Sequence, residues 1–383
     1  MLDTLNAFDA RSAASAETID LGRTMAPTPR SFSKFLQNGI SNLVSENDLS
    51  TLVRHHRFLG TDTDKLLGAR WLAPRLGTSV PLDRLLVTGG TQSALLVLLG
   101  TLLKPGDLVL TERLTYPAIR PLTNLLGLKL DGVEIDSDGM LPAALEDCCR
   151  RLAPTLLLTS PTVQNPTTSI MPAARRAEIA AIARKYNVLI VEDDVQALLV
   201  DDPPPPISTY APEISWYVMS LAKSISIGLR VAYPVGPDAD SVSSLRTNLR
   251  SVSSWFVSPL SAALVQTWMQ DGSAAKILTE VKNESRARQR LASEILHDFE
   301  FETKPCALHL WMPLPAGWSS DAFGERSEAA GVHVQTSGLF TLPGNQPPAS
   351  IRVSLGRPLE RETLSRALEI LAGLLRTARP ASG

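Results

Sequence analysis

Cysteine is scarce in this sequence. The 383 residues include only three cysteines, at positions 148, 149 and 306. Cys148 and Cys149 are adjacent in the chain, and neighbouring cysteines do not easily bridge each other. These counts exclude a disulfide framework and favour a reducing, cytoplasmic setting.

The chain also lacks an excess of basic charge and long apolar runs. Lysine and arginine together number 37 against 39 acidic residues, so the composition gives no sign of a nucleic-acid partner. The first residues, MLDTLNAFDARSAAS, do not combine a basic segment with an apolar one, and we expect no signal peptide. The longest apolar stretch, Ala94–Leu103, is interrupted by Gly100 and Thr101. It is too short to cross a bilayer, so no membrane partner is expected and a buried helix is predicted there.

From about residue 60 onward, short apolar runs alternate with helix-like segments. Several runs are continuously apolar, which is typical of strands covered on both faces. This rhythm predicts an α/β fold with a mostly parallel sheet and helices on both of its faces. The expected strands are Leu85–Val87, Leu108–Leu110, Leu156–Thr159, Leu189–Val191, Tyr217–Met219 and Arg230–Tyr233, and the expected helices include Thr91–Leu103, Pro142–Leu152 and Pro172–Tyr186.

The pattern changes after about residue 250, where a smaller α+β domain is expected. The predicted elements there are helices Arg246–Leu264 and Ser273–Phe299, strands Ala307–Met312 and Ile351–Leu355, and a final helix Glu360–Thr377. We therefore expect an N-terminal arm over 1–45 that belongs to the small domain, a large domain over 46–250 and a small domain over 251–383. The chain is long enough for such a two-domain core.

The segment SLAKSISIGLR follows one predicted strand and contains Lys223. A lysine amine forms an imine with an aldehyde when its surroundings favour the neutral amine. The Ser220 hydroxyl and the Arg230 guanidinium, in the same segment, suit a phosphate group. The lysine alone is a weak signal, because most lysines are solvated surface residues.

Three acidic residues, Glu192, Asp193 and Asp194, end another predicted strand. The carboxyl ends of strands are where α/β sheets bind ligands. An aspartate there can keep a pyridine nitrogen protonated. A helix N-cap and a divalent-metal site are alternative interpretations, although no phosphate loop of the GxxxxGK type accompanies these residues.

Two further turns follow predicted strands. In VTGGTQS, the chain turns at Gly89 and Gly90, and the helix expected from Thr91 would offer backbone amides to an anion. In SPTVQNPTT, Pro166 favours an extended Asn165, whose amide can donate to a phenolate oxygen. An Asn-Pro pair is also a common turn former.

Tyr116 and Arg352 complete the set of candidates. Tyr116 in LTYPAIR can stack on an aromatic ring, and a half-buried core tyrosine is the alternative. Arg352 in IRVSL can bind a carboxylate with both guanidinium branches. An ordinary surface arginine on an edge strand is its alternative.

These motifs occur in an order that resembles the fold-type-I aminotransferases, which depend on pyridoxal 5′-phosphate (PLP). The sequence is most similar to the aminotransferase domain of MocR/GntR-type proteins, over roughly residues 20–375, and ALHLWMPLP at 307–315 also looks like that group. The resemblance implies a homodimer with active sites shared between subunits. It implies that Lys223 holds PLP as a Schiff base and moves the proton, that Asp193 pairs with the protonated ring nitrogen and that Tyr116 stacks on the ring. Asn165 is implied to bind both O3′ of the cofactor and the substrate, and Arg352 the substrate carboxylate. The implied phosphate ligands are Gly90, Thr91, Gln92, Ser220 and Arg230.

The sequence departs from the family pattern at three places. Val195 and Gln196 stand where a tyrosine usually follows the acidic pair, and Thr168 replaces a glycine. His55 stands where a tyrosine usually reaches the phosphate of the partner subunit. If Gln196 does not replace the missing donor, the pKa of the imine should rise.

The leading hypothesis is amino transfer between an L-amino acid and a 2-oxo acid, without a metal. The departures at Val195 and His55 leave open another PLP reaction, such as that of a lyase, decarboxylase, racemase or oxidase. A non-catalytic module that senses PLP or an amino acid is a further alternative. Because no winged-helix segment precedes the match, an enzyme is favoured over a transcription factor. A metal-dependent enzyme that uses the acidic residues at 192–194 is a remote alternative.

Overall fold

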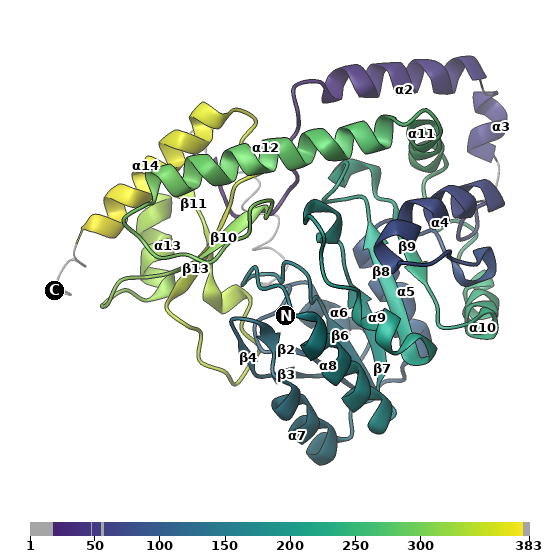
Figure 1. Ribbon diagram of the computed structural model, residues 1–383, viewed down its shortest axis with the longest axis horizontal. Coiled ribbons are helices and arrows are strands. Elements are labelled where there is room, and N and C mark those ends of the chain that lie inside the picture. Colours follow the sequence, from purple (N-terminus) through teal and green to yellow (C-terminus); the bar gives the residue numbers. More distant parts are fainter. Residues whose placement is uncertain (1–17, 47, 55–56, 378–383) are drawn as a thin grey trace.

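The computed structural model describes residues 18–46, 48–54 and 57–377 (Figure 1). Its centre is a six-stranded sheet in the order β3-β2-β6-β7-β8-β9. The first five strands are parallel and only β9 runs antiparallel. The strands are β2 (Leu108–Glu112), β3 (Lys129–Val133), β6 (Leu156–Thr159), β7 (Leu189–Asp193), β8 (Ser215–Ser220) and β9 (Ala232–Val235).

Helices cover both faces of this sheet, as the continuously apolar runs predict. One face packs against α5 (Thr91–Leu102), α6 (Ile119–Leu125) and α10 (Ala239–Arg250), and the other against α7 (Pro142–Leu152), α8 (Ala173–Lys185) and α9 (Ile207–Tyr210). Successive strand residues divide between the faces: Val191 lies in the first core and Ile190 in the second. The predicted fold class is thereby confirmed.

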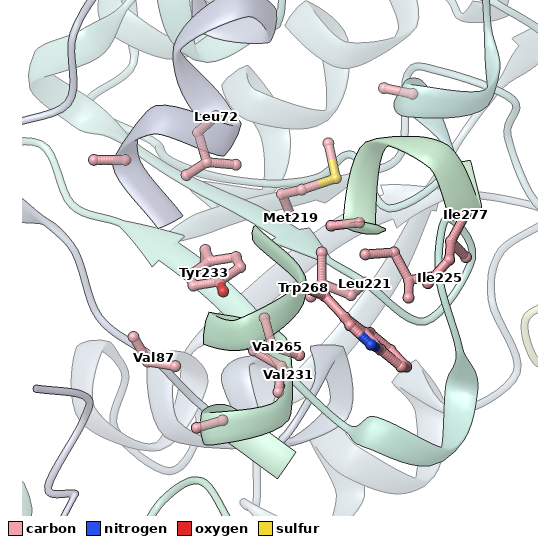
Figure 2. Packing of buried hydrophobic residues seen from close by; sticks show 14 of the residues in the cluster. Leu72, Val87, Met219, Leu221, Ile225, Val231, Tyr233, Val265, Trp268 and Ile277 are labelled. Carbon is pink, nitrogen blue, oxygen red and sulfur yellow. The ribbon is translucent and has the colours of Figure 1, made fainter. Parts of the chain in front are cut away.

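A third core supports the end of the sheet formed by β8 and β9. There α4 (Asp62–Leu76), α11 (Pro259–Gln270) and α12 (Ser273–Ile295) pack on the two strands and on the segment between them. Figure 2 shows Leu221, Ile225 and Val231 of that segment within the cluster that contains Trp268 and Ile277. The short segment that carries Lys223 is therefore held by apolar side chains on both sides of the lysine.

The C-terminal part has a three-stranded antiparallel sheet in the order β10-β13-β12. Its strands are β10 (His309–Pro313), β12 (Gln335–Thr336) and β13 (Ser350–Ser354), and α12, α13 (Ser320–Ala329) and α14 (Arg361–Arg376) pack on one face. Leu310, Met312, Ile351 and Val353 point into that core. Because side chains alternate along a strand, His309, Trp311, Arg352 and Ser354 lie on the opposite face.

The first described residues connect both parts. The two-residue strand β1 (Ile19–Asp20) pairs with β11 (Val332–His333) beside the small sheet. The chain then runs to α2 (Phe32–Glu46), which contacts α11 and α12, and to α3 (Leu49–Arg54). Figure 1 shows α12 extending along both parts, with α2 and α11 near one end and α14 near the other. The predicted boundaries at residues 45 and 250 stay predictions.

Two predicted elements are wrong. Residues 85–88 run beside β9 but form only isolated bridges, Leu85 with Val235 and Thr88 with Ala232. The Leu86 N–H donates to the Pro234 carbonyl, and Pro234 has no N–H to return, so a regular ladder is not formed. The predicted helix Arg246–Leu264 is divided into α10 and α11. Pro259 cannot continue a helix and instead occupies the first turn of α11, capped by Ser258.

The remaining predicted elements are confirmed within a few residues at each end. The apolar stretch from residue 94 forms the buried side of α5, as expected. Within the residues that the structure describes, every helix is too short or too polar to cross a membrane.

Candidate active site

The predicted site residues that the structure describes gather where the strand ends of the large sheet meet the polar face of the small sheet. Asp193 ends β7, Lys223 lies three residues beyond β8, and Asn165 lies in the loop after β6. Gly90 precedes α5, and Arg352 is central in β13. The carboxyl ends of parallel strands converge at one edge, which is why residues far apart in sequence meet there.

Lys223 has surroundings that disfavour its charge. Burial lowers its pKa to about 8, and the positive charge of Arg352 acts in the same direction, while Asp193 opposes the shift. Its Nζ donates a hydrogen bond to the carbonyl of Thr24. The lowered pKa increases the share of neutral amine near neutral pH, which favours imine chemistry.

Asp193 is a buried carboxyl group. Burial raises its pKa to about 7; the N–H of Val195, which donates to Oδ1 at 3.3 Å, counteracts that rise, and the charge of Asp194 adds to it. A cationic N–H placed beside this group would favour its charged form. The environment therefore fits a partner for a protonated ring nitrogen.

The neighbouring acids Glu192 and Asp194 make structural hydrogen bonds instead. Glu192 accepts the backbone N–H groups of Ile207 and Ser208 at 3.0 and 2.8 Å. Asp194 accepts from Arg75 Nε at 2.7 Å and from the Tyr217 hydroxyl at 3.0 Å. Across the described ranges, no group of three or more histidine, cysteine or acidic side chains is arranged to hold a metal ion.

The start of α5 brings together groups that suit an anion. Gly90 has a φ of 91°, and a Cβ atom there would lie 3.4 Å from the guanidinium of Arg230. Thr91 Oγ1 donates to Ser220 Oγ at 2.9 Å, and Arg230 Nη2 donates to Gln92 Oε1 at 3.2 Å. Backbone amides, two hydroxyls and a guanidinium converge here, which suits a phosphate.

Tyr116 contacts the start of α5 through its hydroxyl. Gln92 Nε2 donates to its hydroxyl at 3.0 Å, and its ring packs against the core below α5. Burial raises the pKa of the phenol, with a further contribution from the charge of Asp193. The phenol therefore stays neutral, and its flat ring is available for stacking.

Arg352 is only 5% exposed and lies on the central strand of its sheet. The alternative of a surface arginine on an edge strand is therefore wrong. Nη1 donates to Asn165 Oδ1 at 2.7 Å, Nη2 donates to the Gly22 carbonyl, and the guanidinium lies 4.7 Å from the centre of the Phe340 ring. Burial lowers its pKa to about 10, which still leaves it charged at neutral pH. A buried cation of this kind fits a substrate carboxylate.

The departures from the family pattern have different outcomes. Gln196 Nε2 donates one of its two N–H groups to the Val163 carbonyl at 2.7 Å, and its expected replacement of the missing donor stays a prediction. His55 lies outside the described residues. Its expected contact with a phosphate stays a prediction.

Three residues at this site were not singled out from the sequence. Gly22 and Thr24 contribute the carbonyls that meet Arg352 and Lys223, and His309 contacts the turn after Asn165. Gly22 and Arg352 are 330 residues apart. Every residue has a backbone carbonyl, so residue type could not predict the contacts of Gly22 and Thr24. His309 could have been found, because it stands in the ALHLW segment that contributed to the resemblance.

The family model for aminotransferases of class I and II matches residues 54–371. The chain belongs to this family. The cofactor implied for this family and its structural neighbours is pyridoxal 5′-phosphate. The resemblance stated from the motifs is thereby confirmed, while the roles of the individual residues stay predictions.

The relatives include both regulators and enzymes. The chain is 28% identical over 372 residues to the uncharacterized HTH-type transcriptional regulator YdeF of Bacillus subtilis. The matched region covers 97% of this chain and 79% of YdeF. It is 24% identical over 318 residues to aromatic-amino-acid aminotransferase 1 of Thermococcus litoralis, with 80% and 76% covered. The kynurenine aminotransferase of Pyrococcus horikoshii has a similar fold, with a TM-score of 0.86, 20% identity and coverage of 98% and 94%.

Proposed function

We propose that this member of the family is a PLP-dependent aminotransferase that moves an amino group between an L-amino acid and a 2-oxo acid. The observation that carries the proposal is that an amine, a carboxyl group and a guanidinium with perturbed pKa values lie at the same site. Lys223 has a lowered pKa, Asp193 has a raised pKa, and Arg352 is a buried cation at the same site. Such opposed shifts among neighbouring groups are typical of catalytic sites.

The residues present fit the cofactor. The start of α5 with Ser220 and Arg230 would hold the phosphate, and Tyr116 would contact the ring. Asp193 would face the ring nitrogen. Asn165 accepts from Arg352 through its Oδ1, which leaves Nδ2 available to donate to the ring hydroxyl. When bound, PLP supplies an electron sink for the bond that is broken at the substrate α-carbon.

Three side chains of this protein then have separate roles in the reaction. Arg352 binds the substrate carboxylate and orients the α-carbon. Lys223 Nζ, as the free amine, accepts the α-proton. Because the pKa of Lys223 is about 8, the protonated amine can also release that proton near neutral pH. Asp193 stays charged beside the ring nitrogen and keeps the proton there.

One contact to the N-terminal segment should change when the cofactor binds. The Thr24 carbonyl accepts from Lys223, and the Gly22 carbonyl accepts from Arg352. The imine that the proposal assigns to Lys223 takes up its Nζ, so we expect the contact with Thr24 to be broken when the cofactor is bound.

A shared active site between two subunits is part of the proposal. Several large apolar side chains are exposed on α2, α3, the segment before α11 and the first turn of α11, namely Ile40, Val44, Val53, Val252, Trp255 and Leu260. Exposed apolar groups gathered on neighbouring elements are typical of a protein interface. We expect a homodimer, which the sedimentation velocity of the purified protein tests.

The decisive experiment is product analysis with a panel of amino acids and 2-oxoglutarate. Formation of glutamate supports amino transfer, whereas ammonia, carbon dioxide or peroxide supports another PLP reaction. Lys223→Ala should abolish turnover and the visible absorbance of bound cofactor, with the exposed Lys34→Ala as a control. Full activity in Lys223→Ala would overturn the assignment.

A sensing role is the second candidate, because YdeF is described as a transcriptional regulator. A sensor would bind PLP and an amino acid without net conversion. The absence of any product over many hours, with a cofactor spectrum that changes on amino-acid addition, would favour this role.

A further inference from the structure

His309 lies on the polar face of the small sheet, next to Arg352. In the antiparallel pair β10 and β13, His309 is opposite Ser354, and Trp311 is opposite Arg352. Residues two apart on a strand share a face, so the imidazole and the guanidinium project from the same side of the sheet. The histidine is completely buried.

The imidazole makes one specific contact with the other part of the molecule. His309 Nε2 lies 3.1 Å from the carbonyl oxygen of Pro166. A carbonyl only accepts, so Nε2 carries the hydrogen and Nδ1 is an acceptor. Burial holds the pKa of His309 well below its usual range, and the charge of Arg352 adds to that effect. The imidazole is therefore a neutral donor.

Arg352 and His309 hold two consecutive residues. Arg352 Nη1 donates to Asn165 Oδ1, and His309 donates to the carbonyl of Pro166. On the opposite side, Gln164 anchors the same loop by donating to the Leu114 carbonyl at 2.6 Å. The turn at 165–166 is thus held from both parts of the chain, and His309 supplies one of the two side-chain contacts from the small sheet.

Packing alone does not account for this histidine. Nδ1 is buried and finds no hydrogen-bond partner among the described residues. An unpaired buried acceptor is unfavourable, and an apolar side chain of similar size would avoid it. The benefit that offsets this penalty is the donor at Nε2, which pairs a buried carbonyl at the active site.

We propose that His309 is a positioning residue for recognition of the substrate carboxylate. It acts through Pro166 and Asn165 on the orientation of Arg352. A guanidinium binds a carboxylate through two parallel hydrogen bonds, so its plane must be set accurately. Asn165 sets that plane through Nη1, and His309 sets the place of Asn165. The inference rests on the proposed aminotransferase function.

The test compares two variants of the holoenzyme that differ in the donor. His309→Leu removes it, and His309→Gln keeps an N–H group on a side chain of comparable length. The probes are the amino acid that the wild type converts fastest and the amine formed by removing its carboxylate. His297→Leu, at an exposed histidine near the end of α12, is the matched control.

We expect His309→Leu to raise the KM for the amino acid about tenfold, with little change in kcat. The reaction with the amine should stay as in the wild type, and His309→Gln should restore most of the affinity. If His309→Leu does not fold, His309→Asn serves instead, because it is too short to reach Pro166, and the same increase in KM is expected.

Two results would overturn the role of His309: an unchanged KM in the variant without the donor, or an equal loss with the amine. Failure of the wild type to convert any amino acid in the panel is a different result. It would contradict the proposed function itself, and the role of His309 with it.

Discussion

Arg352 Nη1 donates to Asn165 Oδ1 at 2.7 Å across 187 residues of sequence. This hydrogen bond joins the middle of the small sheet to a loop at the edge of the large one. It orients the Asn165 amide, since the oxygen faces Arg352 and the nitrogen is left to donate elsewhere. One contact therefore links the expected carboxylate site to the expected cofactor site.

Arg352→Lys should weaken substrate binding more than cofactor binding. Lysine keeps the charge but cannot make two parallel hydrogen bonds to a carboxylate. We expect the KM for the amino acid to rise about ten- to a hundredfold, in line with the loss of a charge-assisted hydrogen bond. Steady-state kinetics and a PLP titration measure the two effects, with the exposed Arg290→Lys as control. Equal losses in both would contradict the assigned role.

The reaction rate should depend on the ionisation of Lys223. Its pKa is lowered to about 8 by burial first and by Arg352 second. Only the free amine accepts a proton, so the single-turnover rate should increase as pH rises through about 8 and then level off. Stopped-flow absorbance between pH 6 and 10 would measure this, with a rise of roughly a hundredfold overall for a single group that titrates near 8. A rate that falls over the same interval would be inconsistent with Lys223 as the base.

Asp193→Asn should stabilise the cofactor-free protein at neutral pH while removing activity. The pKa of Asp193 is raised from 3.8 to about 7 by burial. Between these values the folded protein binds more protons than the unfolded chain, so the group lowers stability as pH rises from about 4 to about 7. The difference can reach about 4 kcal/mol.

Urea unfolding of the cofactor-free wild type and of Asp193→Asn at pH 5 and pH 8 tests this. The stability gained by the variant over the wild type should be larger at pH 8. An equal difference at both pH values would show that the Asp193 carboxyl titrates as an ordinary surface acid.

Asp194→Asn should act on stability instead of chemistry. Asp194 and Arg75 form a buried pair at 2.7 Å, and Arg75 also donates to Thr162 Oγ1 and to the Pro204 carbonyl. Removing one partner of a buried pair leaves an uncompensated charge, with an expected loss of about 3–5 kcal/mol in the free energy of unfolding. Chemical denaturation measures the loss. The exposed pair of Arg184 and Glu213 offers a control, since Glu213→Gln should change stability by less than about 1 kcal/mol.

Local patterns account for most of the secondary structure. The predicted strand Leu156–Thr159 and the predicted helix Pro142–Leu152 have the predicted bounds, because a buried strand must be apolar along its whole length and a proline is well suited to a first helical turn. The division at Pro259 was also readable from the sequence, since a proline inside a helix removes a hydrogen bond. The failure of residues 85–87 to form a strand was not, because it depends on Pro234 in a segment far along the chain.

The sequence by itself determined the α/β fold and the order of the candidate residues, because periodicity and turn residues act over short distances and motifs after strands collect at one sheet edge. The resemblance singled out Asp193 among three consecutive acids, but only the tertiary structure decided the partners of the other two, because Arg75 and the N–H groups of Ile207 and Ser208 come from other parts of the chain. The tertiary structure alone placed the carbonyls of Gly22 and Thr24 on Arg352 and Lys223, and His309 on the Pro166 carbonyl. These contacts, and the pKa shifts that accompany burial, arise from the packing of two sheets whose residues are far apart along the chain.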